Sequence, residues 1–331
     1  MSTSTPAQHR AAIVSEKAGP MTTTTRQTPT PGPEELLIKV QAIALNPVDH
    51  YQRDHGFPPI PQYPTVLGSD IAGTVVSVGP DVPSGTPKPG ARIAALASGF
   101  YQGSKEDYGA FQDFEEGAIL PLAVFTAWNG WYGAGFDVQT NLTEKEAVLV
   151  WGGSSSIGSL AVQTAKSMGF VVYTTASAKH HGYLNELGAD WVFDYRDEKV
   201  VSQIIDAVKK NGFKMRLAYG AVPDSLTPIL DVLKEVKGDE AAKIAYAPVL
   251  PDDAPTVEGI EAKFAFPPTE PDALRKRFAQ IFGDWLSNRL AAGEVVPSPH
   301  VQVVEGGLDG LNKALDVLKG GVSGAKVVVS L

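Results

Sequence analysis

The residues most able to do chemistry stand in a turn of small residues, Gly152-Gly-Ser-Ser-Ser-Ile-Gly158. The apolar run 147–151 before it shows no alternation, which is typical of a strand buried on both faces. Apolar residues at helical spacing follow from Ile157 to Met168. A tight turn between a buried strand and a helix points backbone N–H groups and the positive end of the helix dipole at one place. The segment therefore predicts an anion site.

The turn resembles the G-x-G-x-x-G motif of dinucleotide-binding proteins, with one departure. Gly153 and Gly158 occupy the first and third glycine positions, and Ser155 replaces the second. Taken alone this match is weak, because a structural turn in any α/β protein could look the same.

A second apolar strand, 171–175, ends about 20 residues beyond the glycines, where a dinucleotide fold places the residue that reads the adenosine ribose. No Asp or Glu follows this strand; Ser177, Lys179 and His180 stand there instead. A hydroxyl and two basic side chains suit a 2′-phosphate and favour NADP over NAD. The structural alternative is that Ser177 caps a helix over 179–187 and that Lys179 is solvated; both can hold.

Length and composition limit the function classes. The 331 residues allow two domains, and the net charge of −9 argues against a nucleic-acid or anionic-membrane surface. The chain has no cysteine, which excludes disulfides, thiolate zinc sites and a cysteine nucleophile. No apolar run approaches a membrane span and no secretory segment is recognised, so we expect a cytoplasmic protein.

The pattern of elements predicts an α/β fold with two domains. Up to Gly109, proline and glycine punctuate short strands, which is typical of an irregular β-rich domain. From 147 strands and helices alternate regularly, as in a doubly wound parallel sheet. The expected domains are 1–122 plus 293–331, and 123–292. The predicted strands are 11–16, 34–45, 71–78, 91–97, 148–151, 171–175, 191–194, 216–219, 242–247, 258–266, 301–304 and 326–331. The predicted helices are 115–135, 157–168, 179–187, 197–210, 224–236, 272–292 and 308–319, and 21–33 is predicted to be a loop.

Several separated motifs together resemble a known family. They are Ala44-Leu-Asn-Pro-Val-Asp49, Tyr63–Gly79, Gly109-Ala-Phe-Gln-Asp-Phe114 with Phe125-Thr-Ala127, the unit 147–169, and Leu187–Tyr195. In this order they resemble a zinc-independent medium-chain dehydrogenase/reductase of the quinone oxidoreductase and trans-acting enoyl reductase branch. The resemblance implies a GroES-like β-rich domain built from both ends of the chain, with an inserted Rossmann-type domain that binds NADPH.

The departures from the zinc-dependent members are informative. Where those members carry Gly-His-Glu, this chain has Gly68-Ser69-Asp70, and their catalytic cysteine and structural-zinc cysteines are also missing. A catalytic zinc needs about three protein ligands. We therefore expect no metal, and reduction of a polarised acceptor rather than oxidation of an alcohol.

The resemblance also assigns roles to positions. It implies that Asn46, Asp49 and Thr126 lie at the nicotinamide end of the cofactor. Tyr51 is a candidate proton donor, and solvent could serve equally well. The implied cofactor contacts are Pro47, Val48, Gly153, Ser154, Ser155, Ser156, Ile157, Ser177, Lys179, His180, Tyr195, Ala245, Tyr246 and Lys326.

Several of these positions have a purely structural interpretation. Asn46 and Pro47 could form a turn after a strand, with Asp49 as a helix cap. Thr126 could be a helical core residue, Tyr195 a half-buried structural tyrosine, and Lys326 a solvated strand lysine. These alternatives stay open from the sequence.

The implied chemistry is hydride transfer from NADPH to an enone, an enoyl thioester or a quinone. The substrate would be a small molecule or a carrier-bound acyl group, and the protein a monomer or homodimer. The alternative is an NADPH-binding sensor or a synthase-docking scaffold with little turnover, for which the replacement of the second glycine by Ser155 leaves room.

Overall fold

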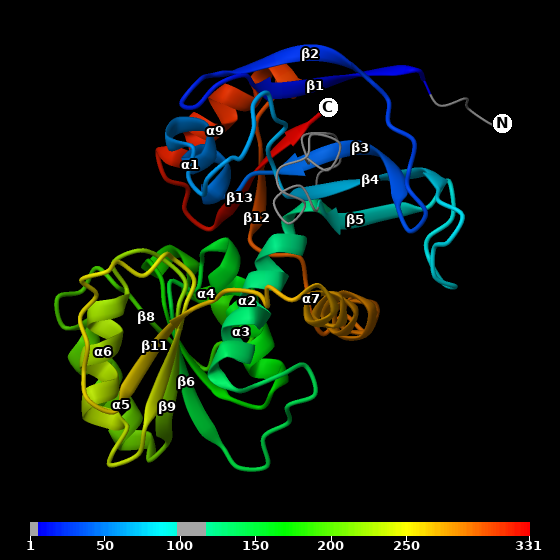
Figure 1. The fold of residues 1–331 in the computed structure, drawn as a ribbon. Helices are drawn as coiled ribbons and strands as arrows, with labels where there is room; N and C mark the ends of the chain where they lie inside the picture. Colours follow the sequence, from blue (N-terminus) through cyan, green and yellow to red (C-terminus); the bar gives the residue numbers. More distant parts are fainter. Residues whose placement is uncertain (1–5, 98–116) are drawn as a thin grey trace. The chain divides into compact units, whose positions relative to one another are not determined.

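The computed structural model describes residues 6–97 and 117–331, which divide into two compact units (Figure 1). Unit 1 comprises residues 1–122 with 300–331, and unit 2 comprises residues 123–299. The second boundary was predicted at 293. Residues 293–299 belong to unit 2 because the Gln163 side-chain amide donates to the Val296 carbonyl (3.1 Å) and to the Ser298 hydroxyl (3.0 Å). The motif 109–114 lies outside the described residues.

Unit 1 is the β-rich part of the chain. In its described residues a five-stranded sheet has the order β12-β13-β3-β4-β5, and β1 and β2 form a separate antiparallel pair. The tail strand β13 pairs antiparallel with β3, Val328 opposite Ala44, so the chain end returns to this unit as predicted. Its elements are β1 Gln8–Val14, β2 Met21–Gln27, β3 Leu36–Ala44, α1 Pro47–His55, β4 Asp70–Val78, β5 Arg92–Leu96, the 3₁₀ helix η3 Gly117–Ile119, β12 His300–Val303, the 3₁₀ helix η6 Gly307–Gly310, α9 Leu311–Lys319 and β13 Ala325–Ser330.

The predicted loop over 21–33 was partly wrong. Its first half is β2, whose residues pair in register with β1 from Met21 opposite Val14 to Gln27 opposite Gln8. The run Thr22–Thr25 is β-branched and favours an extended strand. The prolines that indicated a loop begin only after this strand ends.

Unit 2 is a doubly wound α/β domain. Its six described strands are all parallel in the order β11-β10-β9-β6-β7-β8. Counted from β6, this is the 3-2-1-4-5-6 order of dinucleotide-binding sheets. The elements are α2 Pro121–Ala134, β6 Glu146–Trp151, α3 Ser156–Ser167, β7 Val171–Thr175, the 3₁₀ helix η4 Ala178–His180, α4 His181–Glu186, β8 Trp191–Phe193, α5 Val200–Asn211, β9 Lys214–Gly220, α6 Leu226–Val236, β10 Ala242–Tyr246, β11 Ile260–Phe264, α7 Pro271–Phe278, the π-helix η5 Ala279–Leu286 and α8 Ser287–Ala291.

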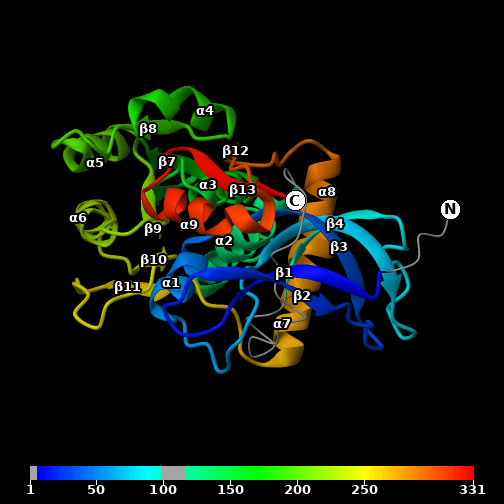
Figure 2. The same cartoon turned by 90° about the horizontal axis from the view of Figure 1, so that it is seen from above.

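Helices cover both faces of this sheet. The views in Figures 1 and 2 show α5 and α6 on one side, and α2 and α3 on the other. The apolar faces of α5 and α6 pack on β6, β9 and β10, and α2 is held by Trp131, whose ring N–H donates to the Thr164 hydroxyl at 2.7 Å. Both faces are therefore buried, which is why β6 reads as an unbroken apolar run.

The long helix predicted over 272–292 is present with an interruption. The segment is α-helical at both ends and becomes a π-helix over Ala279–Leu286. The hydrophobic period does not reveal such a change in winding, because the same apolar residues still face the domain. None of the helices that the structure describes is long and apolar enough to cross a membrane.

Candidate active site

The turn Gly152–Gly158, called the glycine-serine turn below, joins β6 to α3. A Cβ on Gly158 would lie 2.1 Å from the Gly152 carbonyl oxygen, and a Cβ on Gly153 would lie 2.2 Å from the Thr174 hydroxyl oxygen. Neither approach leaves room for a side chain. Both glycines are therefore required by the close packing of the helix start against β6 and β7.

Ser155, at the second glycine position of the motif, caps α3. Its backbone is extended, and its hydroxyl accepts from the Gly158 N–H at 3.0 Å. A serine is a favoured N-cap residue, so the departure from the motif preserves the helix start. Ser155 therefore pairs within the turn, whereas the Ser156 hydroxyl is buried and has no hydrogen-bond partner among the described residues.

The glycine-serine turn fits a bound phosphate group. The first N–H groups of a helix have no partner within it, and the positive end of the helix dipole lies there. The unpartnered Ser156 hydroxyl adds one side-chain donor. The turn also lies beside the switch between β6 and β9, where open α/β sheets bind ligands at the carboxyl ends of their strands.

The predicted ribose-binding residues follow β7. Ser177 is buried, Lys179 is exposed, and the His180 N–H donates to the Ser177 carbonyl at 2.9 Å. The predicted helix over 179–187 is a 3₁₀ turn followed by the short α4, and the Ser177 side chain makes no capping hydrogen bond. A capping role for the Ser177 hydroxyl was therefore wrong. Tyr195, after β8, is half-buried, with 48% of its surface exposed, which agrees with its structural interpretation.

Ala245 and Tyr246 end β10, and both are buried. The Tyr246 ring packs against Gly220, where a Cβ would approach it to 2.5 Å, and burial raises the pKa of its hydroxyl. The Tyr246 side chain thus belongs to the hydrophobic core of unit 2. Only the backbone of these two residues remains a candidate for a cofactor contact.

Thr126 lies on α2 and is partly exposed. Its carbonyl accepts from the Tyr219 hydroxyl at 2.9 Å, and the Tyr219 ring fills the space left by Gly130. Burial raises the pKa of Tyr219 far above its usual range. The Thr126 backbone is therefore fixed by the core, while its side chain is not buried within it.

Residues 46–49 form the start of α1, a helix that the sequence analysis did not predict. Asn46 is the N-cap, Pro47 is the first helical residue, and the Asp49 carboxylate accepts from the Asn46 N–H at 2.8 Å. The structural interpretation of Asp49 as a helix cap is thus correct. Tyr51 also lies within α1, with its side chain exposed and its ring 4.3 Å from that of His50.

Asn46, Asp49, Asp70 and Lys326 form the buried polar cluster of unit 1, and none is more than 5% exposed. The Lys326 ammonium donates to Asp70 at 3.1 Å and to the Asn46 side-chain oxygen. The Asn46 amide in turn donates to Asp70 at 2.9 Å. Lys326 is therefore a buried ion-pair partner, and its interpretation as a solvated strand lysine was wrong.

Asp49 is the unusual group of this cluster. Its second carboxylate oxygen is buried without a partner among the described residues. Burial raises the pKa of Asp49 to about 7, and repulsion from Asp70 adds to this, while the Asn46 N–H and the Lys326 charge act in the opposite direction. One ammonium faces two carboxyl groups, so a neutral Asp49 leaves the cluster with no net charge.

Asp70 was considered in the sequence only as an insufficient zinc ligand. In the structure one of its oxygens accepts from Asn46 and Lys326, and the other accepts from the Leu122 N–H at 2.6 Å. The described residues contain no group of three or more His, Cys, Asp or Glu side chains that could hold a metal ion. No local pattern in the sequence indicates this pairing, because Asp70 and Lys326 lie 256 residues apart.

Comparisons with known proteins agree with this architecture. Residues 32–132 match the model of the alcohol dehydrogenase GroES-like domain, and residues 156–238 match the zinc-binding dehydrogenase model. The chain is 48% identical to trans-enoyl reductase tndF of Aspergillus flavipes over 98% of its length and 99% of that protein. It is 48% identical to trans-enoyl reductase tazE of Aspergillus terreus over 83% of this chain and 97% of that one. An alcohol dehydrogenase superfamily protein from Novosphingobium aromaticivorans has the same fold, with a TM-score of 0.76, 23% identity, and coverage of 97% of this chain and 99% of that chain.

Proposed function

Because the chain belongs to the medium-chain dehydrogenase/reductase family, we propose that it is an NADPH-dependent reductase of activated double bonds. The observation that carries the proposal is the 48% identity, over nearly the whole chain, to a protein named a trans-enoyl reductase. The acceptor would be an enoyl thioester or enone, with a quinone as the related alternative. Bound NADPH would supply the hydride.

The residues of unit 2 fit this cofactor. The glycine-serine turn and the Ser156 hydroxyl would hold the pyrophosphate. Lys179, His180 and Tyr195 follow the two strands at which a dinucleotide fold binds the adenosine ribose, and the absence of an acidic residue after β7 favours a 2′-phosphate. These side chains would bind and orient the cofactor.

The possible metal ligands of unit 1 favour a reaction without zinc. Both Asp70 oxygens already accept hydrogen bonds, one of them from an ammonium group. A catalytic zinc needs about three protein ligands, and within residues 6–97 and 117–331 no group of three or more His, Cys, Asp or Glu side chains could hold a metal ion. An acceptor polarised by its own carbonyl needs no Lewis acid at the reacting carbon, so its reduction suits these residues.

Reduction also needs a proton for the developing enolate. Tyr51 is exposed on α1 and would share this task with solvent. Asn46 is held in place by hydrogen bonds to Asp70 and Lys326 and would help to orient the nicotinamide end of the cofactor. We propose no obligatory acid.

The first test is a titration of the purified protein with NADPH and with NADH, beside Lys179→Ala. A charge-assisted contact is worth about 1.5–3 kcal/mol, or roughly 10- to 100-fold in affinity. We expect NADPH to bind more tightly by such a factor and the variant to lose most of it. Binding of neither coenzyme would contradict the proposal and would favour a scaffold that kept the fold.

The second test is turnover. With NADPH we expect oxidation of the coenzyme in the presence of an enoyl thioester or an enone, with no loss after treatment with a metal chelator. Tight NADPH binding without turnover of any enone, enoyl thioester or quinone would favour the sensor or docking alternative. Loss of turnover on chelation, restored by zinc, would contradict the metal-free chemistry.

A further inference from the structure

The loops that follow β7 and β8 are tied together by one carboxylate. Asp194, the first residue after β8, accepts from the Ala178 N–H at 3.1 Å with one oxygen and from the Arg196 N–H at 3.0 Å with the other. The Ala176 N–H also donates to the Phe193 carbonyl at 3.0 Å. Asp194 therefore fixes the segment 176–180 against the segment 194–197, both at the carboxyl edge of the sheet.

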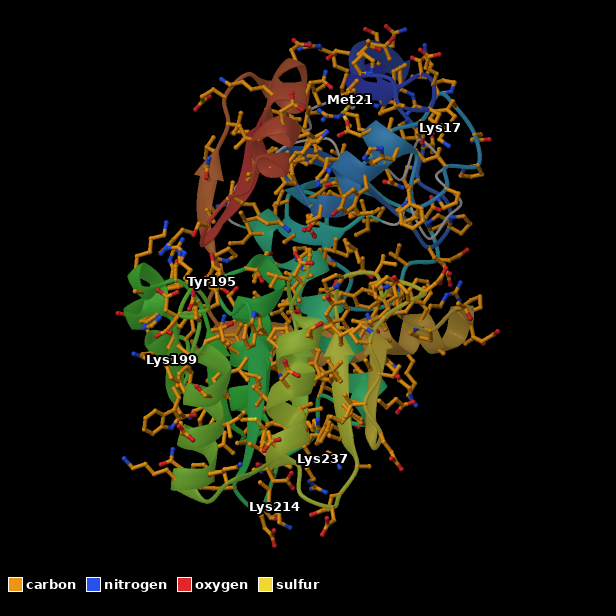
Figure 3. All side chains as sticks on the ribbon, turned by 90° about the vertical axis from the view of Figure 1, so that its left-hand side faces the viewer. Lys17, Met21, Tyr195, Lys199, Lys214 and Lys237 are labelled. Atoms are coloured by element: carbon orange, nitrogen blue, oxygen red, sulfur yellow. The ribbon has the colours of Figure 1, made fainter. Side chains whose placement is uncertain are left out.

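Basic residues stand on both of these segments. Lys179 and His180 stand on the first, and Arg196 stands on the second. The Arg196 guanidinium carbon lies 5.6 Å from the centre of the Tyr195 ring, which favours a planar, stacked orientation of the side chain. Figure 3 shows Tyr195 near one end of unit 2, whereas Lys214 and Lys237 lie at its other end.

The two acidic residues in these loops, Asp194 and Asp197, both accept hydrogen bonds from neighbouring residues. Hydrogen bonds from backbone N–H groups hold the pKa of Asp194 and of Asp197 below their usual range. Asp194 is committed to Ala178 and Arg196, and Asp197 to the Lys199 N–H and the Gln203 amide. The carboxylates thus hold the loops by hydrogen bonds, and the charge of Arg196 also acts on Asp194. Lys179 and Arg196 are both exposed and can meet an anion from solvent.

We propose that Arg196 is a second basic ligand for the adenosine 2′-phosphate of NADPH, and that Asp194 is the positioning residue that holds it beside Lys179 and His180. This inference rests on the proposed function and deepens it. Arginine binds phosphate through several N–H donors in one plane, which a lysine does not do. The proposed phosphate site therefore combines Lys179 and His180 from one loop with Arg196 from the other.

The experiment measures the dissociation constants of NADPH and NADH for the wild-type protein and for Arg196→Ala, Arg196→Lys, Asp194→Asn and Lys210→Ala. Loss of one charge-assisted contact corresponds to roughly 10- to 100-fold in affinity. We expect Arg196→Ala to raise the dissociation constant of NADPH by this factor and to leave that of NADH unchanged. Arg196→Lys should recover part of the lost NADPH affinity. Lys210→Ala removes the same charge at the far end of α5 and should leave both constants unchanged.

Asp194→Asn tests whether Asp194 positions Arg196, and NADH binding serves as the check that the variant is still folded. We expect it to reduce the preference for NADPH while NADH still binds as before, because the pyrophosphate contacts remain. A variant that loses both coenzymes equally would contradict the positioning role. A wild-type protein that prefers NADPH, with an unchanged preference in Arg196→Ala, would overturn this inference alone, whereas a wild-type protein that binds neither coenzyme would contradict the proposed function itself.

Discussion

Each unit contains a candidate functional region, and the two regions are built in opposite ways. The glycine-serine turn of unit 2 is uncharged and comes from seven consecutive residues, and the phosphate site proposed there depends on its backbone N–H groups. The buried polar cluster of unit 1 holds three ionisable groups, and its members lie up to 280 residues apart. An uncharged turn tolerates the loss of a single hydroxyl, whereas a buried ion pair leaves an uncompensated charge when one partner is removed.

The largest expected effect comes from breaking the buried pair. Lys326→Met leaves Asp70 buried and unpaired, and should reduce the free energy of unfolding by about 3–5 kcal/mol. Lys319→Met is the matched control, because its ion pair with Asp54 is half exposed and should be worth only about 0–1 kcal/mol. Urea unfolding of both variants measures the difference, and equal losses would contradict the distinction. Adding Asp70→Asn to Lys326→Met should recover part of the stability.

The next effect is the pH dependence that Asp49 contributes. Its pKa is raised to about 7 in the folded protein, above the unfolded value of 3.8. Between these values the folded state holds a proton that the unfolded state has lost, so stability falls as the pH rises through this window. The fall amounts to roughly 4 kcal/mol and ends above pH 7.

Asp49→Asn removes this titration. The difference in free energy of unfolding between the variant and the wild-type protein should therefore shift in favour of the variant from pH 5 to pH 8. Urea unfolding at both pH values measures this difference. Asp54→Asn is the control: hydrogen bonding to Arg53 and Lys319 lowers the pKa of Asp54 to about 2, so its contribution is lost only as the pH falls below 4. A difference between Asp49→Asn and the wild type that stays constant with pH would exclude the raised pKa.

A smaller effect is expected at Gly158. A Cβ there meets the Gly152 carbonyl, so Gly158→Ala must displace backbone and should cost about 1–3 kcal/mol of stability and weaken NADPH binding. Gly182→Ala is matched to it, since nothing lies within 4 Å of a Cβ at that position on α4. Melting temperature and NADPH titration of both variants test the close approach. An undisturbed Gly158→Ala would show that the turn can relax.

The smallest effect is expected at Ser155. Ser155→Ala removes the N-cap of α3 and should cost about 1 kcal/mol, whereas Ser155→Gly, which restores the second glycine of the motif, should cost only a few tenths. Thermal unfolding separates the two. If Ser155→Gly were the more damaging, the serine would have a role beyond capping.

Much of the fold was predictable because its signals are local. The apolar runs at 147–151 and 171–175 are strands, and the regular alternation after them is the parallel sheet. The strand β2 was missed because its polar Thr22–Thr25 run has no alternation of apolar and polar residues, and its partner β1 decides its conformation. The π-helical winding of Ala279–Leu286 likewise has no sequence period of its own.

The candidate functional residues also divide into those predicted from local sequence and those decided by packing. By itself, the sequence determined the glycine-serine turn, the missing acid after β7 and the resemblance to the family, because each depends on residue types at short spacing. Only the tertiary structure decided that Lys326 is buried against Asp70 and Asn46, that burial raises the pKa of Asp49, and that Asp194 joins two loops. Burial and charge pairing depend on which distant strands become neighbours, and that is a property of the packed chain.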